Sequence, residues 1–418
     1  FPASIPMTLG AHLMQQAVGQ RHGLVLPPQR VSLSMADADI VHYGVPRKID
    51  SPWESASGGV ARRERDARRA AIGEAVERTT SGLVQLPMRP RRDIPPGERI
   101  DAEDFALFTP NQRTRPGFPP GSIHDPECPY VEVFSLFDNS PTWVPQPFVS
   151  LQDPHRTGVP NSSGLAAGPD AHAALLRGVQ ELIERDALMT TWLHGLSGRA
   201  VAPPDPLASE VARLSGEFTV LDLTPAYSPF PVAAVMGGIP KRGVWRYSLG
   251  VACKHDWRSA VEKAHLEWNQ GVLFAGIYGE LADVSRIRKN SELHSFDEHA
   301  MYYTLYPELW PDLPILREKS VLHAPSRRAA PEEPRRALEV ARKALLDAGI
   351  RVYYREVSTI DAIQAGVRVV KALSPDMALI HSHDAWPFLH KVDGMVESRY
   401  PGRGPESRFP NLKPHPLG

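Results

Sequence analysis

Residues 174–187 read ALLRGVQELIERDA and contain the pentapeptide ELIER at positions 181–185. A close copy, EAVER, occurs much earlier in the chain, at 74–78. Hydrophobic residues recur around both pentapeptides at helical spacing, so each lies within a predicted helix. On a helix, Glu-x-x-Glu-Arg places two carboxylates and a guanidinium on one face. Two predicted helices therefore carry the same charged face.

A third predicted helix follows the same template. The three helical windows lie near 61–81, 171–195 and 257–279. Each has small residues seven and three positions before a glutamate, and Glu or Gln three positions after it. The template residues are Ala67, Ala71, Glu74 and Glu77; Ala174, Gly178, Glu181 and Glu184; Ala260, Ala264, Glu267 and Gln270. At about 100° per residue these positions share one helix face, which Arg78 and Arg185 extend in the first two helices.

The simplest interpretation of these faces is solvent exposure, with Glu–Arg pairs worth about 0.2–0.5 kcal/mol each. An exposed face, however, has no reason to favour Ala or Gly at two positions before every glutamate. Small residues instead predict that another part of the molecule, or a ligand, approaches closely. The opposite side of the second helix, with Leu175, Val179, Leu182 and Ile183, is the predicted core-facing stripe.

Convergence of the three faces would bring five carboxylates into one site. Their mutual repulsion would raise their pKa values unless cations neutralise them. Mg²⁺ commonly binds through one or two carboxylates plus substrate phosphates, and arginine binds phosphate oxygens with its forked guanidinium. The chain contains neither GxxxxGK[ST] nor GxGxxG. The residues therefore predict a polyphosphate site with more than one Mg²⁺ and without the usual phosphate-binding loops.

The segment VPNSSGLAAGPD, residues 159–170, directly precedes the second helix. Its short polar side chains and glycines suit close approach of a ligand, and the helix N-terminus that follows favours anions. The candidate binding residues are Asn161, Ser162 and Ser163. Taken alone, the segment is equally typical of an ordinary turn with a helix N-cap.

Composition restricts the function classes. The 418 residues are 42% hydrophobic and 23% charged, as in soluble globular proteins. A net charge of −1 gives no indication of nucleic-acid or membrane-surface binding, and no apolar run reaches the roughly 18 residues of a spanning helix. Cys128 and Cys253 are the only cysteines and form no CxxC motif, so we expect a reduced, cytoplasmic protein.

Short β-rich runs lie between and after the three helices, which predicts an α/β or α+β fold. A further helix is predicted over 334–349, with Gly349 as its stop signal. Strands are predicted at 130–137, 218–224, 231–237, 244–250, 350–358, 366–373 and 377–383. Within the last of these, His381 and His383 are interpreted as core or surface histidines rather than a metal pair. The stretch RPRRD at 89–93 is predicted to be an ordinary loop.

These motifs resemble the YcaO superfamily. The similar segments are SGGVARRERDARRAAIGEAVERTTSG, PNSSGLAAGPDAHAALLRGVQELIERDA and GVACKHDWRSAVEKAHLEWNQG, in that order, with later similarity up to PNLKPHPLG. The resemblance covers roughly 57–418 and implies a YcaO-type fold, with mixed β-sheets and long helices lining a central ATP site. We expect one YcaO domain over 57–418 with a Pro-rich tail at 401–418, and an N-terminal segment, 1–56, packing on it.

The resemblance also implies roles for the template residues, with ATP and Mg²⁺ as cofactors. The implied metal-binding residues are Glu74, Glu77, Glu181, Glu184, Glu267 and Gln270. The implied nucleotide contacts are Arg78, Asn161, Ser162, Ser163 and Arg185. The implied reaction is cyclodehydration, in which a Cys, Ser or Thr side chain of a precursor peptide attacks the preceding amide and ATP phosphorylates the amide oxygen.

The end of the chain favours the azoline-forming branch of the superfamily. Such members resemble this chain in a Pro-rich tail whose terminal carboxylate reaches the active site. Pro414 and Pro416 have the expected spacing, but Gly418 stands where a last proline is expected, and a glycine end is expected to hold the carboxylate less firmly. These three residues are the candidate catalytic positions, and a disordered tail is the alternative.

The resemblance implies partners as well. The substrate would be a ribosomal precursor peptide, delivered by a separate leader-binding protein of the ubiquitin-activating-enzyme-like or ThiF-like kind, because no long N-terminal module for this task is recognised. A homodimer is also expected, with no nucleic acid and no membrane as partners. The alternatives are macrolactamidine or thioamide formation and, in another class, a non-catalytic ATP-binding scaffold.

Overall fold

The computed structural model describes residues 14–31, 40–47, 57–118, 123–124, 127–153, 159, 161–241, 243–281, 283–326 and 329–418. Much of the predicted N-terminal segment lies outside these ranges. The chain divides into two compact units. Unit 1 comprises Phe1–Phe105, Pro119–Leu182 and Glu333–Asp376, and unit 2 comprises Ala106–Phe118, Ile183–Glu332 and Met377–Gly418. The chain passes from unit 1 to unit 2 within helix α4 (Ala171–Leu193).

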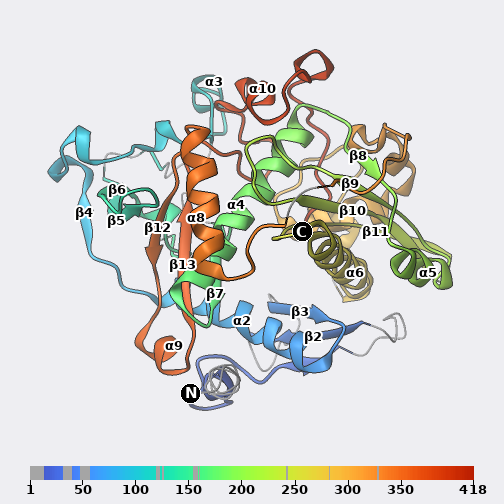
Figure 1. The fold of residues 1–418 in the computed structure, drawn as a ribbon, viewed down its shortest axis with the longest axis horizontal. Helices are drawn as coiled ribbons and strands as arrows, with labels where there is room; N and C mark the ends of the chain where they lie inside the picture. The colour runs from blue at the N-terminus through green and yellow to red at the C-terminus, as the bar shows by residue number, and fades with distance from the viewer. Residues whose placement is uncertain are drawn as a thin grey trace. The chain divides into compact units, whose positions relative to one another are not determined.

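Unit 1 contains two antiparallel sheets. The first has the order β1-β2-β3, and the second has the order β4-β5-β12-β13-β7 with β6 paired to β5. Their strands are β1 (Gln29–Arg30), β2 (Val41–Val45), β3 (Ser57–Ala61), β4 (Met88–Pro90), β5 (Pro129–Ser135), β6 (Pro141–Pro145), β7 (Leu165–Gly168), β12 (Tyr353–Glu356) and β13 (Arg368–Leu373). Besides the first part of α4, the helices are α2 (Glu64–Leu83), α8 (Pro334–Asp347) and α9 (Ile360–Gln364) (Figure 1). Short 3₁₀ helices are η1 (Arg91–Asp93), η2 (Pro96–Glu98), η3 (Ala102–Asp104) and η4 (Gln146–Phe148).

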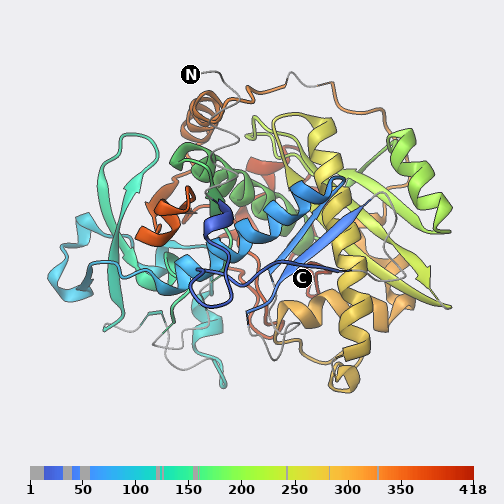
Figure 2. The same cartoon turned by 90° about the horizontal axis from the view of Figure 1, so that it is seen from below.

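Unit 2 is built around one antiparallel sheet in the order β11-β10-β9-β8. Its strands are β8 (Arg199–Val201), β9 (Glu217–Asp222), β10 (Val232–Lys241) and β11 (Val244–Cys253). Its helices are α3 (Pro110–Arg113), α5 (Asp205–Arg213), α6 (Trp257–Leu281), α7 (Phe296–Leu305) and α10 (Val396–Arg399), with 3₁₀ helices η5 (Val284–Arg286), η6 (Pro307–Asp312), η7 (Pro314–Leu316), η8 (Val392–Gly394) and η9 (Gly404–Glu406). Helix α6 lies across the sheet (Figure 2).

The core of unit 2 lies between α6 and its sheet. Val235 on β10, Ala252 on β11 and Val261 on α6 are fully or almost fully buried in one hydrophobic cluster. Trp268 belongs to the same cluster, and its indole N–H donates to the carbonyl of Gly237, 3.0 Å away. This bond satisfies the one polar atom of a side chain whose large apolar area favours burial.

Most predicted elements are confirmed. The helical windows correspond to α2, α4 and α6, and Gly349 ends α8 with a positive φ of 68°. The strand predicted at 377–383 is wrong, because its backbone bonds go elsewhere: the N–H of Ala378 donates to the carboxylate of Asp186, 2.7 Å away. Strand pairings between named strands are antiparallel. In the part of the chain that is described, no helix is both long and apolar enough to cross a bilayer.

Gly250 on β11 marks the closest helix–strand contact of unit 2. A Cβ there would lie 2.0 Å from the carbonyl oxygen of Ala264 on α6. We expect Gly250→Ala to lower the free energy of unfolding by about 1–3 kcal/mol, because α6 must move away from the strand. Gly97→Ala is the control, since nothing lies within 4 Å of its added Cβ. Equal midpoints for both variants in urea unfolding would contradict the expectation.

Candidate active site

The small residues of the three-helix template lie against strand backbone. A Cβ on Gly59 of β3 would come within 2.2 Å of the amide nitrogen of Ala71 on α2. A Cβ on Gly178 of α4 would come within 2.6 Å of the carbonyl oxygen of Gly164, and Gly250 is equally close to α6. The predicted close approach is therefore confirmed. The group that approaches is the protein's own backbone, so these small residues are packing positions rather than ligand contacts.

The glutamates that follow these contacts are held by backbone N–H groups of three strands and of the turn before β7. In each case one oxygen of the carboxylate accepts a hydrogen bond from the backbone beside the helix. The pairs are Gly58 N to Glu74 Oε2 at 2.9 Å, Ala167 N to Glu77 Oε2 at 3.0 Å, Gly164 N to Glu181 Oε2 at 3.1 Å and Cys253 N to Glu184 Oε2 at 3.2 Å. Bonds of this kind fix the carboxylate orientation before any ligand binds.

Unit 1 contains the first group of these carboxylates, which we call the Glu77 cluster: Glu74, Glu77, Glu181 and Lys371. Burial raises the pKa of Glu77 well above its usual range, and the charges of Glu181 and Glu74 raise it further, while Arg78 opposes the shift. Arg78 also pairs with Glu74 at 2.9 Å. Crowded carboxylates of this kind favour a bound cation.

Lys371 is the member of this cluster that sequence reasoning missed. It lies on β13, is 5% exposed, and its ammonium donates to the carbonyls of Asn161 at 2.8 Å and Ser163 at 2.6 Å. Burial lowers its pKa to about 8, against the opposing charges of Glu181 and Glu77. The sequence contains a signal for it, which is a lysine within the apolar run GVRVVKAL. Because lysine is rarely buried unless it is paired, a lysine in such a run indicates polar partners elsewhere in the fold.

Unit 2 contains a second group, the Glu184 cluster: Glu184, Glu267, Lys254 and Lys263. Lys263 pairs with Glu267 at 3.0 Å along α6. Burial lowers the pKa of Lys254, as does the charge of Lys263, while Glu184 and Glu267 raise it. Burial, reinforced by Glu184, raises the pKa of the Cys253 thiol. Both clusters thus combine carboxylates with a lysine whose pKa is lowered by burial.

The predicted nucleotide-binding segment forms a compact turn. The side chain of Asn161 accepts a bond from the N–H of Ser163 at 2.9 Å and donates to the carbonyl of Val159 at 3.3 Å. The carbonyl of Ser162 accepts from the N–H of Leu165 at 2.8 Å. The turn interpretation is therefore confirmed, and a nucleotide role for these residues stays a prediction. Gln270 and Arg185 are partly buried on α6 and α4.

The C-terminal tail is packed into unit 2. Of its last residues, His415, Pro416 and Leu417 are buried, and the hydroxyl of Tyr303 donates to the carbonyl of Pro414 at 2.7 Å. A Cβ on Gly418 would lie 2.5 Å from the Cβ of Ala300 on α7, so a glycine fits where a proline was expected. The alternative of a disordered tail is wrong.

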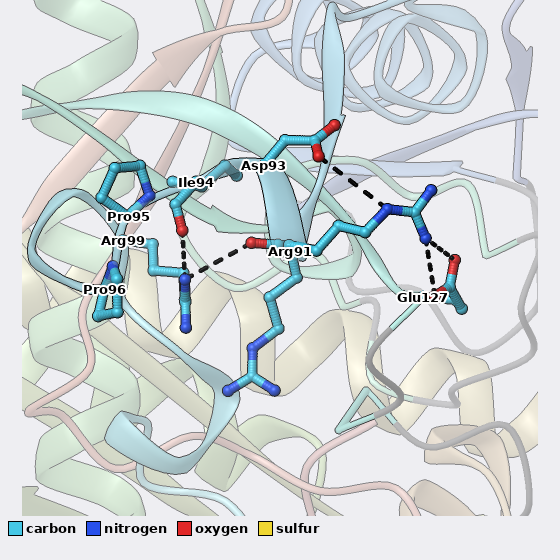
Figure 3. A pocket seen from close by; sticks show the side chains of 8 residues that line it. Arg91, Asp93, Ile94, Pro95, Pro96, Arg99 and Glu127 are labelled. Carbon is cyan, nitrogen blue, oxygen red and sulfur yellow. Dashed lines mark hydrogen bonds and ion pairs between the residues drawn. The ribbon is translucent and has the colours of Figure 1, made fainter.

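A separate hollow lies in unit 1, around the stretch predicted to be a loop. It is lined by Arg91, Arg92, Asp93, Ile94, Pro95, Pro96, Arg99 and Glu127. The stretch itself forms the end of β4 and η1. Figure 3 shows the guanidinium of Arg99 bonded to the carbonyls of Arg91 and Ile94. Arg91 and Arg99 both pair with Asp101, so these charges stabilise the local structure.

Comparison with protein families decides the identity. The model of the YcaO cyclodehydratases, described as ATP- and Mg²⁺-binding, matches residues 58–378, more than half of the chain. The chain belongs to the YcaO family. Among curated proteins, none matches this chain significantly.

Solved structures share the YcaO fold with this chain. A heterocyclase in complex with substrate and cofactor aligns with a TM-score of 0.74 at 20% identity, covering 98% of this chain and 57% of that one. YcaO from Methanopyrus kandleri, bound with AMPPCP and Mg²⁺, gives 0.65 at 16%, covering 90% and 91%. The E. coli microcin synthetase McbBCD complex gives 0.65 at 14%, covering 95% and 98%. This chain thus spans little more than half the length of the first of these structures.

The carboxylates of this YcaO protein suit Mg²⁺ by their chemistry. Hard oxygen donors are what Mg²⁺ prefers, and the raised pKa of Glu77 reflects negative charge that a cation would neutralise. No three His, Cys, Asp or Glu side chains among the described residues are already grouped as a metal site. A Mg²⁺ ion that keeps waters and phosphate oxygens needs only one or two carboxylates. The donor set therefore fits ATP-bound Mg²⁺.

The raised pKa of Glu77 predicts that Mg²⁺ binding depends on pH. Because Mg²⁺ binds the carboxylate and not the acid, binding releases the proton that Glu77 holds. We expect the affinity for Mg²⁺·AMPPCP to rise as the pH is raised above the usual carboxyl range, by up to about tenfold per unit while Glu77 is protonated. Calorimetry across this range checks it, with Glu77→Gln expected to flatten the profile. An equally steep profile in that variant would contradict the assignment.

Proposed function

We propose that this protein is an ATP- and Mg²⁺-dependent cyclodehydratase that forms thiazolines or oxazolines from Cys, Ser or Thr residues of a precursor peptide. The observation that carries the proposal is the set of four glutamates on α2 and α4, each fixed by a backbone N–H from a strand or from the turn before β7. Glu181 and Glu184 stand about one helical turn apart on α4, so that helix carries carboxylates of both clusters.

The proposed reaction needs a good leaving group at an amide oxygen. The side chain of Cys, Ser or Thr gives up its proton and adds to the preceding carbonyl carbon, and the former carbonyl oxygen takes the γ-phosphoryl group of ATP with release of ADP. Loss of phosphate and a proton then gives the azoline, with a net loss of one water. Bound Mg²⁺ would supply charge neutralisation at the phosphates. Glu74, Glu77, Glu181, Glu184 and Glu267 would hold it, while Arg78 and Arg185 would bind phosphate oxygens.

Gln270 is proposed to orient the metal ligands, and Asn161, Ser162 and Ser163 to approach the nucleotide. The buried tail supports the azoline branch over the thioamide and macrolactamidine alternatives, because Pro414 is bonded by Tyr303, Pro416 is buried and Gly418 lies against α7. We propose that Pro414, Pro416 and Gly418 present a carboxylate that serves the reaction as a proton acceptor. The lysines of both clusters would neutralise part of the carboxylate charge before the nucleotide arrives.

The proposed partners are a precursor peptide and a separate leader-binding protein. Their support is that the microcin synthetase McbBCD, which shares this fold, is a multiprotein complex, and one of its structures has pro-MccB17 bound. A homodimer and a cytoplasmic location are proposed on the resemblance described above.

The test incubates the protein with ATP, Mg²⁺, a Cys-, Ser- and Thr-rich precursor peptide and its partner protein. We expect loss of one water per modified residue in the peptide mass, with phosphate released in equal amount. Sulfur incorporation or an amidine macrocycle would instead assign the alternative branches. Nucleotide binding without turnover under all these conditions would support a non-catalytic scaffold.

A further inference from the structure

The C-terminal arm, defined as residues 411–418, is held by side chains from two helices of unit 2. The side-chain amide of Asn411 donates to the carbonyl of Trp192 on α4 at 3.0 Å, and the indole N–H of Trp192 donates to the carbonyl of Lys413 at 2.8 Å. Tyr303 on α7 donates to the carbonyl of Pro414. The arm therefore accepts bonds on its backbone at successive residues, as an extended segment without internal bonds requires.

Beyond Pro414 the arm is held by an imidazole cluster that consists of His299, His381 and His415. The rings of His299 and His415 stack with centroids 4.0 Å apart and planes inclined by 12°. Nδ1 of His299 donates to the carbonyl of His415 at 3.0 Å, and Nε2 of His415 donates to the carbonyl of His381 at 2.7 Å. The exposed fractions are 0% for His299 and His415 and 6% for His381.

The cluster is built from neutral rings. Nδ1 of His415 and Nδ1 of His381 are buried without a hydrogen-bond partner. Protonation would add a buried N–H donor there and place a charge beside a second imidazole, which is unfavourable on both counts. The neutral cluster thus holds the arm, and a charged one would not.

The held arm lies beside α4 and α6. The C-terminus is next to α6 in both views (Figures 1 and 2). The charge of Arg185 on α4 acts on His415. Gly418 lies against Ala300 and Phe296 on α7, where no Cβ fits.

We propose that His299 and His381 are positioning residues, which lock the C-terminal arm through His415 and so hold Gly418 against α7. The lock is a property of the arm, whereas its use in azoline formation rests on the proposed function. The lock requires His415, which lies between Pro414 and Pro416 of the tail. It makes docking of the arm depend on neutral imidazoles.

The pH dependence follows from the groups around the cluster. Burial lowers the pKa of His299 to about 4 and that of His381 to about 3. At a pH below about 6.5, the ordinary pKa of histidine, the imidazoles bind protons when the arm is undocked but not when it is docked. Docking of the arm therefore weakens by up to about tenfold per pH unit for each ring. Asp384, 3.4 Å from Nε2 of His299, acts in the opposite sense, because burial raises its pKa to about 7.

Other charged groups act more weakly on the cluster. Glu298 favours the protonated form of His299, His383 disfavours protonation of His299 and His381, and Arg185 disfavours protonation of His415. Protonation of the three histidines weakens docking of the arm, whereas protonation of Asp384 alone favours it. The net effect of acid is therefore release of the arm.

Trimming of the full chain by carboxypeptidase Y, followed by intact mass, tests the lock. Rates are divided by that of a free peptide NLKPHPLG at each pH, which removes the pH dependence of the protease. We expect the wild-type arm to be trimmed at least about tenfold more slowly than the peptide at neutral pH and to lose this protection near pH 5. If the wild-type chain is trimmed as fast as the peptide at neutral pH, the proposal is overturned.

Paired variants separate the lock from general destabilisation. Asn places its amide N–H near the Nδ1 position and Gln near the Nε2 position. We therefore expect His299→Asn and His415→Gln to keep most of the protection, and His299→Gln and His415→Asn to lose it by about tenfold. His323→Gln, on the exposed surface, is the matched control. The inverse order, or equal protection in all four variants, would refute the lock.

The same variants test the link to catalysis. If azoline formation falls in parallel with protection, the arm serves the active site. Protection lost with activity unchanged would overturn that link. Protection that follows the predicted order in a protein without cyclodehydratase activity would sustain the lock and refute only the proposed function.

Discussion

Replacing Glu184 with Gln lowers the turnover number for ATP-dependent azoline formation by about 10²–10³-fold, the cost of losing one charge-stabilising group in the transition state. The amide of Gln keeps the shape of the carboxylate and can still accept the N–H of Cys253, so the helix–strand contact is preserved. What is lost is the negative charge through which Glu184 would hold Mg²⁺. Phosphate release and peptide mass, measured at saturating ATP, check this expectation.

Two further measurements sharpen this prediction. The Mg²⁺ concentration that gives half-maximal rate should rise in the Glu184→Gln variant, because one anionic ligand is missing. Glu280→Gln is the matched control, since Glu280 lies exposed on α6 and no role is proposed for it. Unchanged ATP turnover in Glu184→Gln would refute the catalytic role and favour the scaffold interpretation.

Replacing Lys371 with Met lowers the free energy of unfolding by about 3–5 kcal/mol, the usual cost of breaking a buried charge cluster by removing one partner. The variant leaves the carbonyls of Asn161 and Ser163 without the ammonium donor. It also leaves Glu77 and Glu181 without the buried positive charge beside them. Urea unfolding, followed by circular dichroism, measures the loss.

The loss should depend on pH. Without Lys371 the pKa of Glu77 rises further, so the folded state holds a proton that the unfolded state releases, and its stability falls as the pH rises. The penalty is therefore expected to be smaller in mild acid than at neutral pH. Lys343→Met is the control, because its pair with Asp347 on α8 is exposed and contributes little. Equal losses in both lysine variants would contradict the cluster.

Local patterns predicted the helices of the template well. The spacing of Ala67, Ala71 and Glu74 showed that another group approaches α2 closely. Such small residues, spaced about one helical turn apart, can be recognised from a short stretch of sequence. The pattern could not tell that the approaching group is the strand carrying Gly59, since strand and helix alignment is set by packing. It also could not predict that backbone N–H groups distant along the chain hold the glutamates.

The failed predictions have a common cause. The run MALIHSH has the composition of a strand, yet its backbone is satisfied by Asp186 and by the arm rather than by a neighbouring strand. Lys371 was overlooked because its partners, the carbonyls of Asn161 and Ser163, lie about two hundred residues away along the chain. Buried polar groups of this kind are defined by distant partners.

By itself, the sequence determined which helices exist, which faces carry the carboxylates and which family the chain belongs to, because these depend on residue type and spacing along one element. Tertiary structure alone decided what those faces contact: the strand backbone at the glycines, Lys371 beside Glu77 and Glu181, and the arm locked by His299 and His381. Close packing and the burial of polar groups select one arrangement among many that the same local pattern allows.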